Sequence, residues 1–214
     1  MLITEDTFII SDTHFGHSNM IDFEPSRRFL ADLQSVSEGS DIASKVYHKI
    51  ADSWNAVVGK TDTILHLGDF AWGGLDTIRT WAMRLNGRII LIKGNHDRDA
   101  SVYIELGIEV IEGIMANGKH IPAPKHVNAL ITEINGSRIM FSHLPVEEDG
   151  IKRDEKFNPA ISKLFEIFLE YNCDINVHGH VHSRSLEGSL YCRNVSIEVM
   201  GFKPVRIRDI LNGI

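Results

Sequence analysis

Four consecutive aliphatic residues, Ile89–Ile92, form the apolar run that most restricts how this chain can fold. A run this short, without polar alternation, is typical of a strand buried on both faces of a sheet. The run stops at Gly94, where the missing Cβ permits a tight turn or a close approach to a ligand. Asn95, His96 and Asp97 follow. An amide, an imidazole and a carboxylate thus stand at a strand end, where open α/β sheets bind ligands, although a turn that caps a helix would also use them.

Apolar runs and helical spacing alternate through the first half of the chain. The predicted strands are 7–10, 63–67, 89–92 and 108–111, and the predicted helices are 42–57, 75–85 and 102–106. This alternation predicts a layered α/β core with helices packed on a sheet. Residues 15–40 lack a steady period and are predicted to be a long loop with a short helix at 29–36.

The second half of the chain has clearer turn signals than periodicity. An Asn-Gly pair at 135–136 separates two apolar runs, which predicts a β-hairpin over 129–141. Asn158 and Pro159 are the cap and first-turn residues expected at the start of a helix. Loose alternation over 189–199 indicates closing antiparallel strands.

Length and composition limit the class of protein. The 214 residues, 43% of them hydrophobic, suit one globular domain over 1–214. Glu5 and Asp6 stand where a signal peptide carries positive charge, and no apolar run nears the roughly 20 residues of a membrane span, so we expect a cytoplasmic protein with no membrane contact. The two cysteines give no disulfide framework. The net charge of −7 argues against a broad basic face for long duplex nucleic acid.

Five segments of the chain end in side chains that bind metal ions. These are Asp12 with His14, Asp69, Asn95 with His96, His143, and His180 with His182. Strands of a common sheet or sandwich bring their ends together, so five such endings predict one convergent site. Oxygen and imidazole donors without cysteine favour Mn²⁺, Fe²⁺, Zn²⁺ or Ni²⁺ over a structural thiolate zinc site. The donors exceed what one ion needs, which favours a pair of ions that share Asp69.

Other polar residues have simpler interpretations. His66 lies inside a predicted strand, where a core histidine is more common than a ligand. Arg27 and Arg28 lie in the long loop, where a solvated arginine is the simpler interpretation and a phosphate clamp is the alternative. His120 and His126 are expected to be exposed to solvent.

The ligand-bearing segments have a specific order. The chain contains DTH at 12–14, GD at 68–69, GNHD at 94–97, SH at 142–143 and GHVH at 179–182. Together these blocks closely resemble the calcineurin-like metallophosphoesterases, and the resemblance spans residues 11–182. The segments SDTHFGHSNM, SHLP and NVSIE are similar to the small bacterial and phage members of that superfamily.

The resemblance implies a fold and a site. The implied fold is a two-sheet αββα sandwich, and the implied cofactors are two divalent ions, with Mn²⁺ favoured and Fe, Zn or Ni as alternatives. The implied metal ligands are Asp12, His14 and His182 on one ion, Asn95, His143 and His180 on the other, and Asp69 on both. His96 would be the general acid that protonates the leaving group after attack by a hydroxide that bridges the ions. The resemblance does not identify the residue that orients the His96 imidazole, and Asp97 is the candidate.

One departure from the family pattern narrows the substrate. The phosphoprotein phosphatase branch continues its GD block into an Asp-Arg-Gly element, whereas residues 70–74 here are FAWGG. This difference argues against a phosphoserine protein substrate. We therefore expect a phosphodiesterase for small phosphodiesters such as cyclic nucleotides or RNA ends. The alternatives are a phosphomonoesterase and a non-catalytic scaffold, and exposed Trp72 or Phe15 anchors would favour the scaffold.

Overall fold

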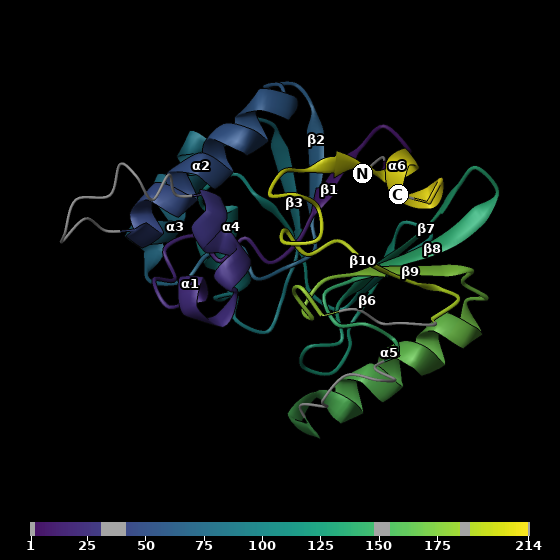
Figure 1. The fold of residues 1–214 in the computed structure, drawn as a ribbon. Coiled ribbons are helices and arrows are strands. Elements are labelled where there is room, and N and C mark those ends of the chain that lie inside the picture. Colours follow the sequence, from purple (N-terminus) through teal and green to yellow (C-terminus); the bar gives the residue numbers. More distant parts are fainter. Residues whose placement is uncertain (1–2, 31–41, 148–154, 185–188, 214) are drawn as a thin grey trace.

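The computed structural model describes residues 3–30, 42–147, 155–184 and 189–213, and it contains two β-sheets packed face to face with helices on their outer sides (Figure 1). The first sheet contains β1 (Phe8–Ile10), β2 (Thr63–His66), β3 (Arg88–Ile92), β4 (Glu109–Ile111) and β11 (Val205–Arg206), in the order β11-β1-β2-β3-β4. The second contains β5 (Ile114–Ala116), β6 (Lys119–Ile121), β7 (Ala129–Ile134), β8 (Ser137–Ser142), β9 (Ile175–His178) and β10 (Cys192–Asn194), in the order β10-β9-β8-β7-β5-β6. The predicted αββα sandwich is confirmed.

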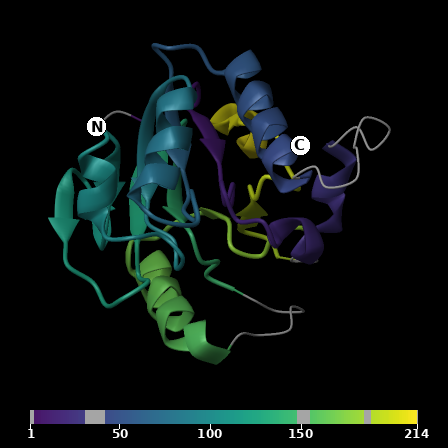
Figure 2. The ribbon, with the colours of Figure 1, turned by 90° about the vertical axis from the view of Figure 1, so that its left-hand side faces the viewer.

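The helices surround the sandwich. All but the last cover its two outer faces, and the last, at residues 207–211, packs with the residues between the sheets. They are α1 (Met20–Phe23), α2 (Ile42–Val57), α3 (Leu75–Arg84), α4 (Ala100–Ile104), α5 (Asn158–Glu170) and α6 (Ile207–Leu211), with 3-10 helices at Pro25–Leu30 and Glu155–Phe157. Figures 1 and 2 show α2 and α5 on opposite sides of the strands. Among the described residues, no helix has both the length and the apolar character needed to cross a bilayer.

Alternation of side chains along the strands builds the layers. On β3, Ile89 and Leu91 pack in the core under the helices, while Ile90 and Ile92 pack between the sheets. Successive residues of a strand point to opposite faces, so a strand buried on both faces must be apolar throughout. The predicted buried strand is therefore confirmed. On β8, Met140 likewise belongs to the core that includes residues of α5.

Parallel pairing gathers the strand ends at one place. β1, β2 and β3 are mutually parallel neighbours in the first sheet, and β8 is parallel to β9 in the second. A bridge between Ser11 and Ser196 then joins the chain after β1 to the chain after β10. The ligand-bearing segments that follow these strands consequently meet where the two sheets come together.

Several sequence predictions are wrong or incomplete. β10 pairs in parallel with β9, so the antiparallel closing strands predicted at 189–199 are wrong. The antiparallel tail strand is instead β11, which pairs with β1 and has only two residues. Strands this short carry too little alternation to be recognised. The helix predicted at 29–36 lies, beyond residue 30, outside the described residues.

Candidate metal centre

The backbone bends sharply at the predicted ligands. Asp12, His14, Asp69, His180 and His182 all have positive φ, between 48° and 69°. Residues other than glycine adopt this left-handed backbone conformation uncommonly, and such backbone strain concentrates at functional sites.

Glycines allow the loops to approach one another. A Cβ on Gly94 would lie 2.3 Å from Oδ1 of Asp69, and a Cβ on Gly179 would lie 2.4 Å from Oδ2 of Asp12. Any larger residue would displace these carboxylates. The glycine of the GNHD block and that of the GHVH block are therefore steric requirements of the site.

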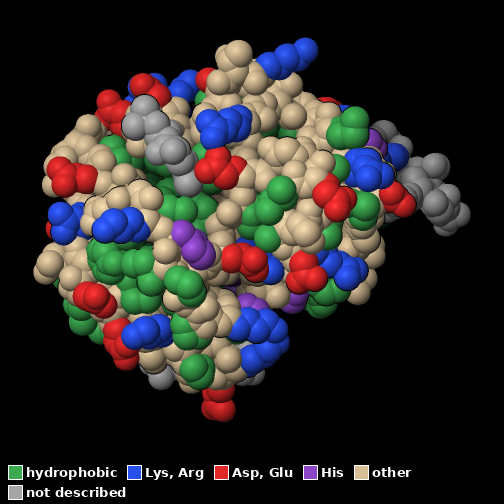
Figure 3. All heavy atoms as spheres, turned by 180° about the vertical axis from the view of Figure 1, so that it is seen from behind, with side chains coloured by type: hydrophobic (Ala, Val, Ile, Leu, Met, Phe, Trp, Pro, Cys, Tyr) green, Lys and Arg blue, Asp and Glu red, His purple; other side chains and the backbone are tan. Residues whose placement is uncertain are grey.

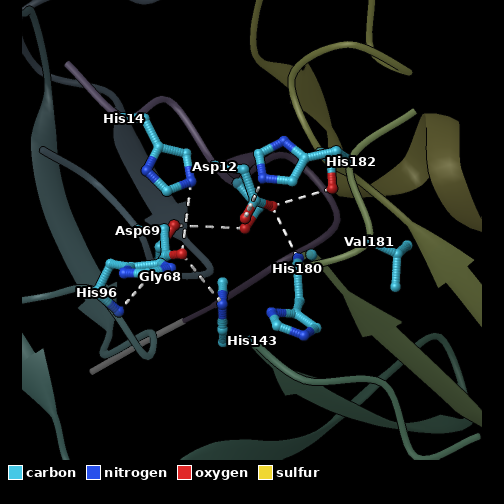
Figure 4. A network of polar contacts seen from close by, with 12 residues as sticks. Asp12, His14, Gly68, Asp69, His96, His143, His180, Val181 and His182 are labelled. Atoms are coloured by element: carbon cyan, nitrogen blue, oxygen red, sulfur yellow. Dashed lines mark hydrogen bonds and ion pairs between the residues drawn. The ribbon is translucent and has the colours of Figure 1, made fainter. Parts of the chain in front are cut away.

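One group of predicted ligands consists of Asp12, His14 and His182. One ligand atom from each of these residues lies within 4.8 Å of the others. The two imidazoles stack with ring centroids 5.2 Å apart, and Nε2 of His182 is 3.9 Å from Oδ1 of Asp12. Figure 4 shows Asp12 between the two imidazoles.

The other group surrounds His143. Its Nε2 atom lies 2.8 Å from Oδ1 of Asn95 and 3.5 Å from Oδ2 of Asp69. The ring of His180 borders this group, with its centroid 5.2 Å from that of His143. The same Oδ2 atom of Asp69 is 3.4 Å from Nε2 of His14 in the first group. Asp69 thus lies between the two groups.

The electron-pair donors of the site are arranged to bind cations rather than to form hydrogen bonds with one another. Within the described part of the chain, Oδ1 of Asp12 and Nε2 of His14 are buried without a hydrogen-bond partner. The Nδ1 atom of His143 is 2.8 Å from the Leu67 carbonyl. When the ring is neutral and Nδ1–H donates to this carbonyl, the Nε2 lone pair faces the oxygens of Asn95 and Asp69. Converging electron-pair donors of this kind need a cation between them.

The family model of the calcineurin-like phosphoesterases matches residues 7–184 of the chain. The chain belongs to this family. It is therefore a metal-dependent phosphoesterase, in agreement with the converging ligands.

Similar proteins cover nearly the whole chain. An uncharacterized protein of Methanocaldococcus jannaschii is 24% identical over 94% of this chain and 86% of its own length. The gene 66 protein of Mycobacterium phage L5 is 28% identical, over 95% of this chain and 91% of its own. Among solved structures, a protein of unknown function from Aquifex aeolicus has a TM-score of 0.68 and 29% identity, covering 97% of this chain and 98% of its own.

The ionisable groups of the phosphoesterase site have strongly shifted pKa values. Burial raises the pKa of Asp69 to about 7. Burial by itself would lower the pKa of His182, but the Asp12 carboxylate outweighs it and the pKa is raised to about 9. Asp69 raises the pKa of His143 in the same way, against the effect of burial. Burial holds the pKa of His14 well below 6.5.

Metal binding by this phosphoesterase is expected to release protons. Near pH 7 the metal-free protein holds a proton on His182 and on part of the Asp69 population, and a divalent ion must displace these protons. We expect about one to two protons to be released at pH 7, and metal affinity to rise with pH up to about 9, where His182 is deprotonated. Calorimetry in buffers of different ionisation enthalpy measures this release. An affinity that stays constant between about pH 6 and pH 8 would contradict the prediction.

A buried ion pair behind the site was missed by the sequence analysis. Arg27 is fully buried, which corrects its interpretation as a solvated loop residue. Its Nε atom donates to Oε1 of Glu198 at 2.7 Å, and its Nη atoms donate to the carbonyls of Asp12 and Thr13. Oε1 of Glu198 also lies 3.2 Å from Nδ1 of His182, so that Nε2 of this imidazole faces Asp12. The NVSIE segment that ends at Glu198 was the only available signal.

Asp97 connects two ligand loops. Its Oδ2 atom accepts from the backbone N–H groups of Asp69 and Gly94, each at 2.8 Å. Its Oδ1 atom accepts from the Phe70 N–H and from the Tyr103 hydroxyl. The hydrogen bonds of this carboxylate thus hold the GD loop against the GNHD loop.

The other predicted residues are also placed. His96 is exposed beside Asp69, to which its backbone N–H donates at 2.9 Å. His66 is buried, with Nε2 2.9 Å from the Thr13 hydroxyl, as a core histidine should be. His120 is exposed and His126 is only half-buried.

Proposed function

We propose that this phosphoesterase is a binuclear phosphodiesterase for small phosphodiesters such as cyclic nucleotides or RNA ends. One observation carries the proposal: Oδ2 of Asp69 lies 3.4 Å from Nε2 of His14 and 3.5 Å from Nε2 of His143. A single carboxylate in contact with both groups of ligands is the arrangement that a shared pair of ions requires. Oxygen and imidazole donors are compatible with Mn²⁺, Fe²⁺, Zn²⁺ and Ni²⁺, and among these we propose Mn²⁺, with Fe, Zn or Ni as alternatives.

Each ligand has an assigned role in this proposal. Asp12, His14 and His182 hold one ion, Asn95, His143 and His180 hold the second, and Asp69 bridges both. Two divalent ions bound here would lower the pKa of a coordinated water to about 7 and polarise the phosphoryl oxygens.

His96 is the proposed general acid. It lies beside Asp69 but outside the ligand groups, where it can reach the oxygen of a leaving group. The partial burial of the His96 ring, with the charges of His143, His17 and Lys156, lowers the pKa of His96. Its protonated form is therefore a stronger acid than an ordinary imidazolium ion.

The surroundings of the site have room for a small substrate. A cavity of about 450 Å³ lies beside Asn95. Its lining mixes the basic residues Lys93, Lys125 and His126 with the acidic residues Asp97, Asp99 and Glu112. This volume is in the range of small-molecule sites. Acidic and basic side chains are interspersed over the face shown in Figure 3, which does not favour long duplex nucleic acid there.

The proposal is tested with a chromogenic phosphodiester and the matching monoester. We expect metal-dependent hydrolysis of the diester in Mn²⁺, lost on chelation and restored when the metal is returned. Faster hydrolysis of the monoester would favour a phosphomonoesterase instead. Inactivity on both esters with two metals bound would favour the non-catalytic scaffold.

A further inference from the structure

Three aromatic rings form an exposed surface beside the proposed centre. His17, Phe23 and Trp72, here called the aromatic platform, have His17 in the middle, with ring centroids 4.3 Å from Trp72 and 6.1 Å from Phe23. Trp72 is 43% exposed and Phe23 is 66% exposed. The other two tryptophans, Trp54 and Trp81, are buried. Neighbouring large apolar side chains left in water at a site indicate that a ligand covers them.

The platform adjoins the reacting groups. The Trp72 ring centroid is 5.3 Å from that of His96, and the His17 centroid is 5.9 Å from that of His14. Figure 4 shows His96 and His14 on the Asp69 side of the centre, away from His180. A phosphate held at the centre with its leaving oxygen toward His96 therefore has its leaving group directed toward Trp72.

Hydrogen bonds fix the platform before any ligand binds. The backbone N–H of Trp72 donates to the Phe15 carbonyl at 2.8 Å, and Phe15 itself is fully buried. Nε of Arg98 donates to the Gly73 carbonyl at 2.9 Å, and the Tyr47 hydroxyl donates to the His17 carbonyl at 2.7 Å. The backbone that carries these rings is thus held in place, which reduces the entropy lost on binding.

We propose that the aromatic platform binds the nucleobase on the leaving-group side of a nucleotide phosphoester. This inference rests on the proposed function and specifies its substrate class. Every nucleobase has a flat π-face that stacks on tryptophan, and stacking of this kind tolerates different bases. The bases of a duplex are already stacked on each other, so the ligand is a mononucleotide or a single-stranded end. A protein docked on Trp72 would instead cover His96 and obstruct the ester.

The test compares adenosine 5′-monophosphate with ribose 5-phosphate, which lacks only the base. Calorimetry on the full-length, metal-loaded protein measures both affinities, and the recovered ligand is checked for hydrolysis. We expect the nucleotide to bind about 5- to 150-fold more tightly, the range that one stacked base provides. Binding should also quench the fluorescence of Trp72, the exposed tryptophan.

Substitutions assign the effect to the platform. Trp72→Ala should bring the two affinities nearly together while leaving that of ribose 5-phosphate unchanged, and Trp72→Phe should keep most of the difference. Leu169→Ala, on α5, removes another exposed side chain (57%) and should change neither affinity.

The possible failures can be told apart. Equal affinities of the wild type for the nucleotide and for ribose 5-phosphate would contradict base binding by the platform. A preference for the nucleotide that survives Trp72→Ala would contradict it as well. The exposed Trp72 would then be left as an anchor for a protein. Hydrolysis of the chromogenic diester would then still support the proposed function. Base-dependent binding without any metal-dependent hydrolysis would overturn the proposed function and the leaving-group assignment, and would leave the platform as a nucleotide-binding surface.

Discussion

Asp69→Asn is expected to lower kcat/KM for the diester by at least about 10³-fold and to cost the protein one of its two metals. The substitution keeps the side-chain volume but removes the negative charge that faces both His14 and His143. Metal ions contribute several kcal/mol of transition-state stabilisation, and each 1.36 kcal/mol is a factor of ten in rate. Elemental analysis of the purified variant and the chromogenic assay measure the two effects.

His96→Ala is the matched contrast to Asp69→Asn. His96 is near the centre but outside the ligand groups, so this variant should keep both metals and lose about 10²- to 10⁴-fold in turnover. Loss of metal from His96→Ala would reassign His96 as a ligand. Full activity of Asp69→Asn with both metals bound would contradict the bridging role.

Arg27→Met is expected to lower the free energy of unfolding by about 3–5 kcal/mol. The side chains of Arg27 and Glu198 are 0% and 1% exposed, so the substitution leaves a buried carboxylate without its main partner. It also removes the donors to the carbonyls of Asp12 and Thr13. Urea denaturation with and without metal measures the loss.

Two controls isolate the buried charge. Arg28→Met removes the neighbouring arginine, whose pair with Asp22 is half exposed, and should cost at most about 1 kcal/mol. Adding Glu198→Gln to Arg27→Met removes the unpaired buried charge. The double variant should therefore lose less free energy of unfolding than the two single variants lose together. Strict additivity would show that the Arg27–Glu198 interaction contributes little.

The local pattern of the sequence was enough to predict the main strands and the residue types of the proposed metal ligands. Ile89–Ile92 could be recognised as a doubly buried strand because β3 needs apolar residues on both faces. Gly94, Asn95 and His96 could be placed in a loop at a strand end because the apolar run stops just before them, and this loop follows β3. The Asn-Gly pair likewise identified the hairpin of β7 and β8.

The tertiary structure decided which distant residues meet. Arg27 and Glu198 are 171 positions apart, and nothing local distinguishes a buried arginine from a solvated one in a long loop. The direction of β10 depended on its pairing with β9, which period-2 alternation does not encode.

Local sequence patterns specify what kinds of atoms the centre offers, because each proposed ligand follows a strand that its own neighbours define. Only the tertiary structure placed Asp69 between His14 and His143, set Glu198 behind His182, and left Trp72 exposed beside His96. Each of these arrangements depends on how strand ends and loops from separate parts of the chain pack together. Packing of this kind is a property of the whole fold, so no local sequence pattern records it.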